Sequence, residues 1–425
     1  MPIEKSKDIT KWIVGLVILG VFYFYGRSVF SQEHALGIFL VVGLGLGYIE
    51  SRSEVGIASG YTEFFVTGNR SRLYGLLLLF GFGAMGALYI HYQSAQSGAV
   101  PSHLASGSQN TIPGTGAVTP VNFGLILGSF LFGVGLTINE GCGLGTLRNI
   151  GQGKMRYLWT MLFLLIGTIP GQMTKYFLDQ SAIHQYSIEL YLPEIFGYGG
   201  TAVVVVSILA VLAFVAERYE TLRKKAGTAK DTEPTNLPDT NKINTQKPPS
   251  KRIFDVLFKI EWSRFFSVLL ITLLLLLALN QTGEKLAVTQ PLLYPAVSLF
   301  QTLGFSFNHP AFSEAVQIVE NGLLNNTDTI QNFGIIFGAM IFALTSTNFS
   351  FSFSLNVKES LWNMLGGFLM GFGAVLASGC IVGALYSGIV NFSLSGWVVF
   401  GSMSLGIWLT VKALNGQIST IPNIK

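Results

Sequence analysis

The amino-acid sequence predicts an all-α integral membrane protein made of two related halves. Of its 425 residues, 50% are hydrophobic, 13% are aromatic and only 11% are charged, and the mean hydropathy is +0.52. An ordinary soluble domain carries about 25% charged residues, so the composition excludes that class. Long apolar runs and a duplicated glycine-rich phrase support the same fold class.

The apolar runs predict nine or ten transmembrane helices, since a spanning helix needs about 20 mainly apolar residues. The runs lie at 12–30, 35–49, 73–92, 121–138, 158–177, 200–216, 264–281, 332–347, 361–377 and 395–412. Several of them are short and interrupted by glycine. The first run follows Lys5, Lys7 and Lys11, as in a signal peptide, but no small-residue cleavage site follows Arg27. We therefore expect a retained first helix.

The distribution of charge divides the chain and orients it. The basic, Thr/Asn/Pro-rich stretch 217–260 cannot bury a core, so we expect a disordered cytoplasmic linker. It separates an N-terminal membrane half, 1–216, from a C-terminal half, 261–425. Loops 93–120 and 282–331 have almost no Lys or Arg and are expected to face outward. A net charge of +4 is modest for a chain of this size and says nothing about nucleic acid; no nucleic-acid partner is expected, and the partner expected is the lipid bilayer.

Each half contains one cysteine, and both cysteines occupy the same place in a repeated phrase. The chain reads GSFLFGVGLTINEGCGLGTL around Cys142 and GGFLMGFGAVLASGCIVGAL around Cys380. When 128–159 is aligned with 366–397 without a gap, about ten of 32 positions agree. Five predicted crossings separate the two copies, and an odd number gives them opposite orientations. We therefore expect pseudo-symmetric inverted repeats, a pattern of transporters whose substrate site lies between the copies.

Glycines around both cysteines predict short broken helices that meet at the membrane centre. They are Gly141, Gly143 and Gly145 around Cys142, and Gly379 and Gly383 around Cys380. Interrupted backbone at membrane depth is tolerated only where it is buried in protein or lines a cavity. Free amides at the breaks, and the positive ends of the short helices that follow, would attract an anion.

The paired thiols are the first candidates for function, and the residues leave several roles open. Two thiols and five scattered histidines have no metal-ligand spacing, so neither a metal nor another cofactor is expected. Nucleophilic catalysis needs an activating base or charge, and the nearest candidates, Glu140 and Arg148, are not matched to that task. The alternatives are a disulfide between the copies, simple packing, and weak hydrogen bonding to a soft, sulfur-containing anion in transit.

The phrases around both cysteines are similar to those of a known family. With GCGLGTL at 141–147 and GGFLMGFGAVLASGCIVGALYSGIVNFSLSGW at 366–397, the chain resembles the YeeE/YedE family of bacterial inner-membrane sulfur transporters. The stretch 50–72 is more loosely similar, and the resemblance covers nearly the whole chain apart from the linker. It implies that Cys142 and Cys380 line a central constriction and hand thiosulfate along through S–H to sulfur hydrogen bonds.

One difference from the family concerns the cargo. The family's thiosulfate importers carry a third cysteine after an Arg/Ser pair, whereas no cysteine stands at 52–57 here. We therefore expect a transporter, not an enzyme, that imports thiosulfate or a related sulfur-containing anion. Arg52 is a candidate at the pathway's entrance, and its pairing with Glu54 is the structural alternative.

Glu140 is expected beside the first thiol, and a soluble sulfur-carrier protein is expected to act in trans. The alternative functions are a membrane sulfurtransferase subunit that carries a persulfide, and a transporter of another sulfur or selenium species.

Overall fold

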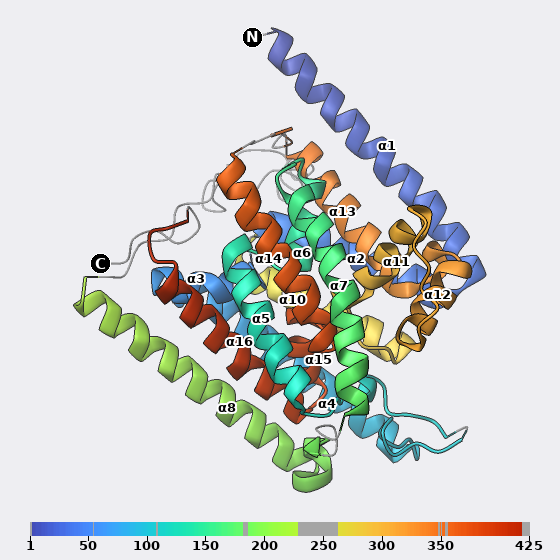
Figure 1. Ribbon diagram of the computed structural model, residues 1–425, viewed down its shortest axis with the longest axis vertical. Helices are drawn as coiled ribbons and strands as arrows, with labels where there is room; N and C mark the ends of the chain where they lie inside the picture. Colours follow the sequence, from blue (N-terminus) through green and yellow to red (C-terminus); the bar gives the residue numbers. More distant parts are fainter. Residues whose placement is uncertain are drawn as a thin grey trace, which may run out of the picture.

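The protein is helical in the computed structural model (Figure 1). The structure describes residues 2–53, 55–107, 109–181, 186–227, 262–346, 349, 351–352 and 356–418. Within these ranges, nine helical segments are long and apolar enough to cross a membrane, which confirms the predicted class of an all-α, multi-pass membrane protein. The β pairing in the same ranges consists of isolated bridges, such as that between Tyr191 and Ser393.

The predicted apolar runs correspond closely to the observed helices. The nine candidate spans are formed by α1 (Pro2–Gln32), α2 (His34–Ser53), α4 (Ser71–Gln96), α5 with α6 (Phe123–Asn139 and Gly143–Gly151), α8 (Leu192–Lys225), α10 (Arg264–Thr282), α13 (Thr327–Thr345), α14 with the short π-helical turn η7 and α15 (Val357–Leu376, Ile381–Tyr386 and Ser387–Val390), and α16 (Leu394–Ala413). The run 158–177 forms α7 (Tyr157–Gln180), which has the length of a span but is not among the nine.

Shorter helices occupy the connections. They are α3 (Ser59–Thr67), α11 (Leu293–Thr302), α12 (Ser313–Glu320) and the single turns η1 (Thr115–Ala117), η4 (Gln290–Leu292), η5 (Pro310–Phe312) and η6 (Leu323–Asn325). Helices α11 and α12 pack on each other, and α11 also packs on α7.

The structure places the start of the linker later than the sequence predicted, because helix α8 extends into the predicted range 217–260. The helix continues to Lys225, so residues 217–225, which the sequence placed in a disordered stretch, are helical. The guanidinium of Arg223 donates to the main-chain carbonyls of Phe65 and Val66 at 2.9 and 3.3 Å. These contacts hold the end of α8 against the bundle. The rest of the predicted linker, 228–260, lies outside the described residues.

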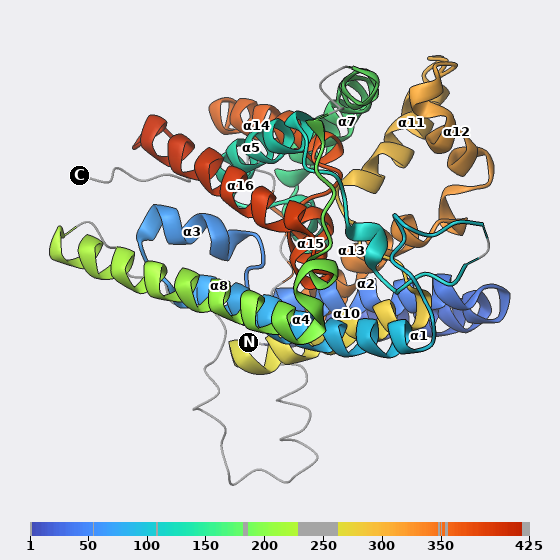
Figure 2. The same ribbon diagram turned by 90° about the horizontal axis from the view of Figure 1, so that it is seen from below.

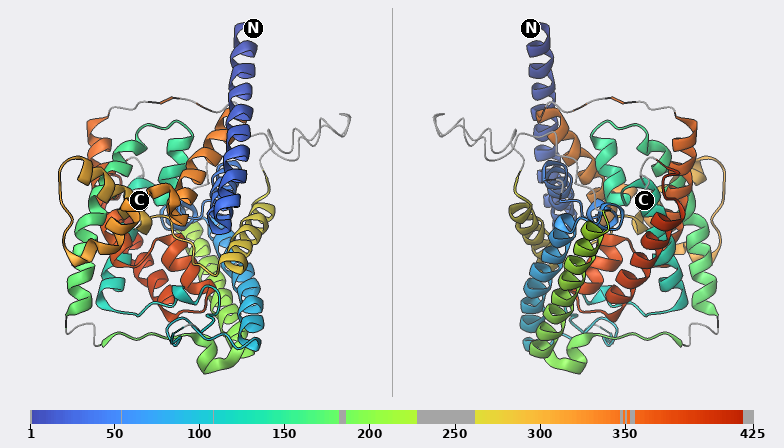
Figure 3. Two further views of the ribbon diagram at one scale, coloured as in Figure 1. Left: turned by 90° about the vertical axis from the view of Figure 1, so that its right-hand side faces the viewer. Right: turned by 90° about the vertical axis from the view of Figure 1, so that its left-hand side faces the viewer.

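The helices form two layers that are joined by short elements. Figure 2 shows α5, α7, α14 and α16 on one side and α1, α2, α4 and α10 on the other, and Figure 3 shows the same division from the side. Helix α6 packs on α7 of one layer and on α2 and α13, while α15 packs on α16 and on α4. The segments that follow the two cysteines therefore connect the layers.

Helices α5 and α14 cross backbone to backbone in the first layer. Gly128 lies against Gly373, and Gly135 lies against Gly366. In the aligned copies Gly128 corresponds to Gly366 and Gly135 to Gly373. Each of the two glycines on α5 therefore contacts the α14 glycine that is aligned with the other α5 glycine. Around this crossing, α5 also packs on α16 while α14 packs on α7. Only glycine permits such a close approach of two main chains.

A methyl group at Gly373 should force α5 and α14 apart. Its Cβ would stand 2.5 Å from the carbonyl oxygen of Gly128, so we expect Gly373→Ala to cost about 1–3 kcal/mol through overpacking. Thermal unfolding of the detergent-purified protein measures the effect as a lower melting temperature. Gly401→Ala on α16, where no atom lies within 4 Å of the added Cβ, is the control. Equal melting temperatures for the two variants would contradict the close crossing.

Candidate functional site

Each cysteine lies in a break between two helical segments. Helices α5 and α14 end shortly before Cys142 and Cys380, and α6 and η7 begin directly after them. We call residues 139–143 the first elbow and residues 377–381 the second elbow. The sequence's glycine-rich phrases therefore coincide with both interruptions.

The two elbows turn through the same unusual backbone conformation. Glu140 has a φ of 55° and Ser378 a φ of 56°, and these residues are aligned in the repeat. A left-handed conformation costs a non-glycine residue about 1–2 kcal/mol, so packing around the elbows must hold it in place. Gly379 follows with a φ of 153°, a value that L side chains rarely adopt. Both breaks therefore share the left-handed residue two positions before the cysteine, while the positive φ of the following glycine occurs only in the second elbow.

Both thiols are buried, and the structure brings them into one region. Cys142 and Cys380 are each 0% exposed, and neither forms a disulfide. The two thiols interact electrostatically, and the main-chain N–H groups of Leu144 and Gly145 lie near the sulfur of Cys142. The start of α6 therefore directs amide hydrogens toward the thiol.

An extended segment, 286–289, lies between the two elbows and was not anticipated from the sequence. Gly383, just after the second elbow, faces the main chain of Leu286 and Ala287, and Gly143 in the first elbow faces the side chain of Thr289. All four residues of the segment are buried. The sequence placed 282–331 in an outward-facing loop, but part of that connection returns into the protein.

Three side chains hold the extended segment by its carbonyl groups. Ser387 Oγ donates to the carbonyl of Leu286 at 3.3 Å. Gln331 Nε2 and Asn332 Nδ2, both on α13, donate to the next two carbonyls, those of residues 287 and 288, each at 2.9 Å. The adjacent Gln331 and Asn332 in an apolar helix could have indicated this contact, because buried amide side chains need hydrogen-bond partners.

Arg148, which follows Cys142 on α6, forms an ion pair with the buried carboxylate of Glu50. Its Nη1 lies 3.8 Å from Glu50 Oε1 and donates to the Glu50 carbonyl at 3.4 Å. Glu50 is 3% exposed, and its Oε1 accepts the main-chain N–H of Ile57 at 2.9 Å. Arg148, considered above as an activating charge for the thiol, is therefore engaged by a carboxylate that also holds the turn after α2.

Arg52 is enclosed by aromatic rings. It is 1% exposed, and its guanidinium carbon lies 5.8, 5.2 and 6.0 Å from the ring centroids of Tyr48, Trp262 and Phe342. Cation–π attraction of this kind stabilises a desolvated guanidinium. The packing ties α2 to the neighbouring elements, while Glu54, the partner considered from the sequence, lies outside the described residues.

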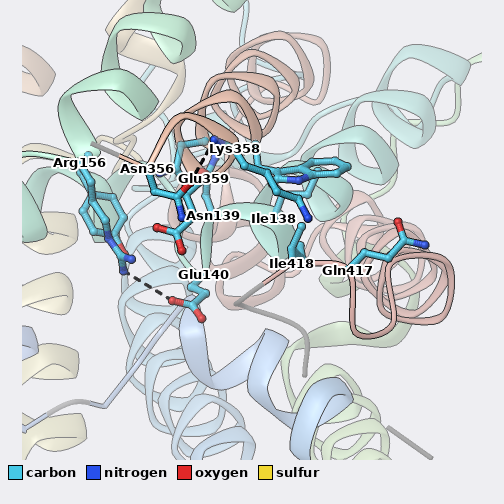
Figure 4. A pocket seen from close by; sticks show the side chains of 12 residues that line it. Ile138, Asn139, Glu140, Arg156, Asn356, Lys358, Glu359, Gln417 and Ile418 are labelled. Atoms are coloured by element: carbon cyan, nitrogen blue, oxygen red, sulfur yellow. Dashed lines mark hydrogen bonds and ion pairs between the residues drawn. The ribbon is translucent and has the colours of Figure 1, made fainter. Parts of the chain in front are cut away.

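Glu140 borders a surface cavity of about 230 Å³ beside the first elbow. Figure 4 shows its carboxylate facing Arg156, whose Nη2 lies 3.7 Å from Glu140 Oε2. Lys358 and Glu359, from the first turn of α14, line the same cavity. The acidic side chains of Glu140 and Glu359 and the basic side chains of Arg156 and Lys358 therefore give this cavity no net charge.

Two lysines lie near the second elbow. Lys175, on α7, donates to Ser378 Oγ at 2.9 Å. Lys285 directly precedes the extended segment, and burial lowers its pKa, as does the nearby charge of Lys175. Helix α7 thus brings a basic side chain to each elbow, Arg156 at its start and Lys175 near its end.

Across the described ranges, no group of three or more His, Cys, Asp or Glu side chains has the arrangement of a metal site.

Comparisons with known proteins identify relatives over most of the chain. The sequence profile of the family described as "Sulphur transport" matches residues 52–409. The chain is 24% identical over 376 residues to "Thiosulfate transporter TsuA" of Escherichia coli, covering 87% of this chain and 92% of the relative. It is 26% identical over 298 residues to "Thiosulfate transporter TsuA" of Spirochaeta thermophila, covering 68% and 77%. A shorter match, 26% over 155 residues, joins it to "Probable transporter YedE" of Escherichia coli, covering 35% and 34%.

The burial of both thiols predicts slow chemical labelling of the native protein. We expect a bulky maleimide to modify Cys142 and Cys380 at least about tenfold more slowly than an exposed thiol, because reaction requires an accessible thiolate. The reference is Ser97→Cys, an exposed position, in a background with both native cysteines changed to serine. Mass spectrometry counts the adducts over time, and labelling of the native thiols at the reference rate would contradict the closed elbows.

Proposed function

Because this chain belongs to the sulphur transport family, we propose that it imports thiosulfate or a related sulfur-containing anion across the cell inner membrane. The observation that carries the proposal is the burial of two free thiols, one from each repeat copy, in a single region. The pathway runs between the two elbows, and Cys142 and Cys380 form its constriction. The relatives named as thiosulfate transporters support this choice of cargo.

The thiols act as a relay in this proposal. Each S–H is a weak donor, suited to the polarizable terminal sulfur of the anion and easily released. Amide hydrogens at the start of α6 already point toward Cys142 and would partly neutralise a passing dianion. Selective conduction needs binding that favours occupancy but still permits release. No covalent step is required, and the protein acts as a transporter rather than an enzyme.

The proposed pathway includes inverted repeats with broken helices at the membrane centre. The reciprocal contacts of Gly128 with Gly373 and of Gly135 with Gly366 support this arrangement, since a two-fold relation makes residue i of one copy contact residue j of the other and j contact i. The matched left-handed residues Glu140 and Ser378 support it at the elbows.

The direction of transport follows from the predicted orientation. Loops 93–120 and 282–331 have almost no Lys or Arg and are proposed to face outward, which puts Lys285 on the outer approach. Lys285 and Lys175 would attract an anion to the second elbow. The charge-balanced cavity at Glu140 is the proposed inner opening, where weaker attraction favours release to a soluble sulfur carrier in trans.

Serine substitutions test the relay. In a strain that depends on this protein for its sulfur source, we expect Cys142→Ser and Cys380→Ser each to lower uptake of labelled thiosulfate about tenfold or more. Serine replaces the soft, weakly donating thiol with a hard hydroxyl that does not match the polarizable sulfur of the anion, and a mismatch of about 1.4 kcal/mol corresponds to a tenfold loss. Gly401→Ala is the matched control, and membrane levels of each variant are measured in parallel.

Unchanged uptake by both serine variants at normal membrane levels would overturn the relay. A stable mass increase of about 32 Da on either native cysteine after exposure to substrate would indicate a persulfide and favour a sulfurtransferase instead.

If Lys285 lies on the outer side of the pathway, its charge should affect the thiosulfate concentration needed for half-maximal uptake. We expect Lys285→Gln to raise the thiosulfate concentration for half-maximal uptake several-fold at low ionic strength, and the difference should shrink as salt is added, because salt screens the attraction. Lys358→Gln, at the other opening, is the control and should leave that concentration unchanged. Equal effects of the two variants would contradict the proposed direction.

A further inference from the structure

A buried histidine lies near the C-terminal end of α4 and takes no part in the proposed relay. His91 is 0% exposed. Its Nδ1 lies 2.8 Å from the hydroxyl oxygen of Tyr191, and its Nε2 lies 3.1 Å from Asn391 Oδ1. Ionisable side chains inside membrane-spanning helices are rare, and they mark paths for ions and protons. His91 is therefore a candidate for a second role in transport.

The neighbours of His91 determine which ring nitrogen carries the proton. Asn391 Nδ2 donates to the carbonyl of Ser387 at 2.8 Å, so the oxygen of that amide faces the ring and Nε2 donates to it. Nδ1 of the neutral ring then accepts the Tyr191 hydroxyl. A second proton on the ring would sit on Nδ1, and the Tyr191 hydroxyl would turn to accept it. Tyr191 also interacts with the partly exposed Tyr198, which gives the turned hydroxyl another partner.

Hydrogen bonds connect the histidine to the extended segment between the elbows. The Asn391 amide is bonded to the carbonyl of Ser387, and Ser387 Oγ donates to the carbonyl of Leu286 at 3.3 Å. Asn391 and Ser387 also line a small cavity of about 10 Å³ together with Lys285. That volume is close to the space that one water molecule needs. The partner of His91 therefore borders the lysine that we placed on the outer approach of the anion.

The other titratable groups at this end of α4 come from α8, α10 and α15 or the residues beside them, since α4 packs on all three helices. They are Tyr191, Glu194 and Tyr198 at the start of α8, Tyr386 before α15, Glu284 and Lys285 after α10, and Tyr92 on α4 itself. Glu194 Oε1 is paired with His103 Nε2 at 3.1 Å. Glu284 and Lys285 carry opposite charges, so an incoming anion is the charge that would favour a proton on His91.

Import of a dianion needs a coupled cation. The membrane potential is negative inside, and each negative charge that moves inward does electrical work against it. A proton that moves with the anion offsets part of this work. Opposite charges attract strongly where little water is present, and the coupling between two bound ligands is reciprocal. A bound anion would thus favour proton binding nearby, and a bound proton would favour the anion.

We propose that His91 binds a proton from the outer side and that the protein moves this proton inward together with the anion. Nδ1 takes up the proton as the anion enters and releases it toward the inner side when the anion has left. No bond of the anion breaks and no electron is transferred. The reversed Tyr191 hydrogen bond and the Asn391–Ser387–Leu286 connection carry the change to the extended segment. This inference rests on the proposed function and adds its driving force.

Proton movement into proteoliposomes tests the coupling. The full chain is reconstituted with a pH-sensitive dye inside, and valinomycin with equal potassium on both sides holds the membrane potential at zero, so that protons do not simply follow charge. We expect addition of thiosulfate outside to acidify the lumen in proportion to the labelled thiosulfate that enters. His91→Gln should lose this acidification. His34→Gln, an exposed histidine at the start of α2, is the control and should keep it.

A second variant leaves the histidine in place. Tyr191→Phe keeps the aromatic ring but removes the oxygen that would accept from Nδ1 of the protonated imidazole. Hydrogen bonds from a charged donor are about twice as strong as neutral ones, so the loss weakens proton binding more than it weakens the neutral form. We expect the outer pH at which uptake is half-maximal to move to a lower value. A merely structural role for His91 would leave that pH unchanged.

The outcomes separate this inference from the proposed function. If thiosulfate enters wild-type proteoliposomes without acidifying the lumen, or if His91→Gln acidifies it as the wild type does, the inference is wrong and the proposed function stands. If the wild type transports no thiosulfate or related sulfur anion, the proposed function itself fails. If His91→Gln is not recovered in membranes, an unchanged pH profile of Tyr191→Phe overturns the inference.

Discussion

The close approach of α5 and α14 is the constraint on which the rest of the structure depends. Because four glycines remove side chains from the crossing, the two main chains touch at Gly128 with Gly373 and at Gly135 with Gly366. Both helices then end at a left-handed residue and a cysteine. The crossing therefore carries the two elbows, with their buried cysteines, into one region of the protein.

The region around the elbows contains two kinds of hydrogen-bond donor, the cysteine thiols and the main-chain N–H groups. No unpaired charged side chain is described beside the first thiol. Arg148 is held by Glu50, so its charge is already paired and is not available to stabilise a thiolate at Cys142. The N–H groups at the start of α6 supply partial positive charge instead. The cations Lys175 and Lys285 lie at the second elbow instead, where the proposed pathway would use them to attract an anion. This distribution of charge supports the proposed passage of an anion.

Much of the fold could be predicted from the sequence, because membrane spans depend on local composition and glycine breaks on local backbone freedom. Cys142 and Cys380 were found because a repeat aligned them. The extended segment 286–289 could not be found in this way, since its burial depends on Gln331 and Asn332, more than 40 residues later. The aromatic enclosure of Arg52 is likewise a product of tertiary contacts that no local pattern contains.

The central claim is the proposal that one sulfur-containing anion passes between the two elbows, with its sulfur at a thiol. A structure of the full-length protein in lipid, determined with selenosulfate so that selenium marks the soft end, tests this most directly. The account predicts a selenium peak within contact distance of Cys142 or Cys380. Selenium bound only outside the elbows, with both thiols still packed against protein, would contradict it.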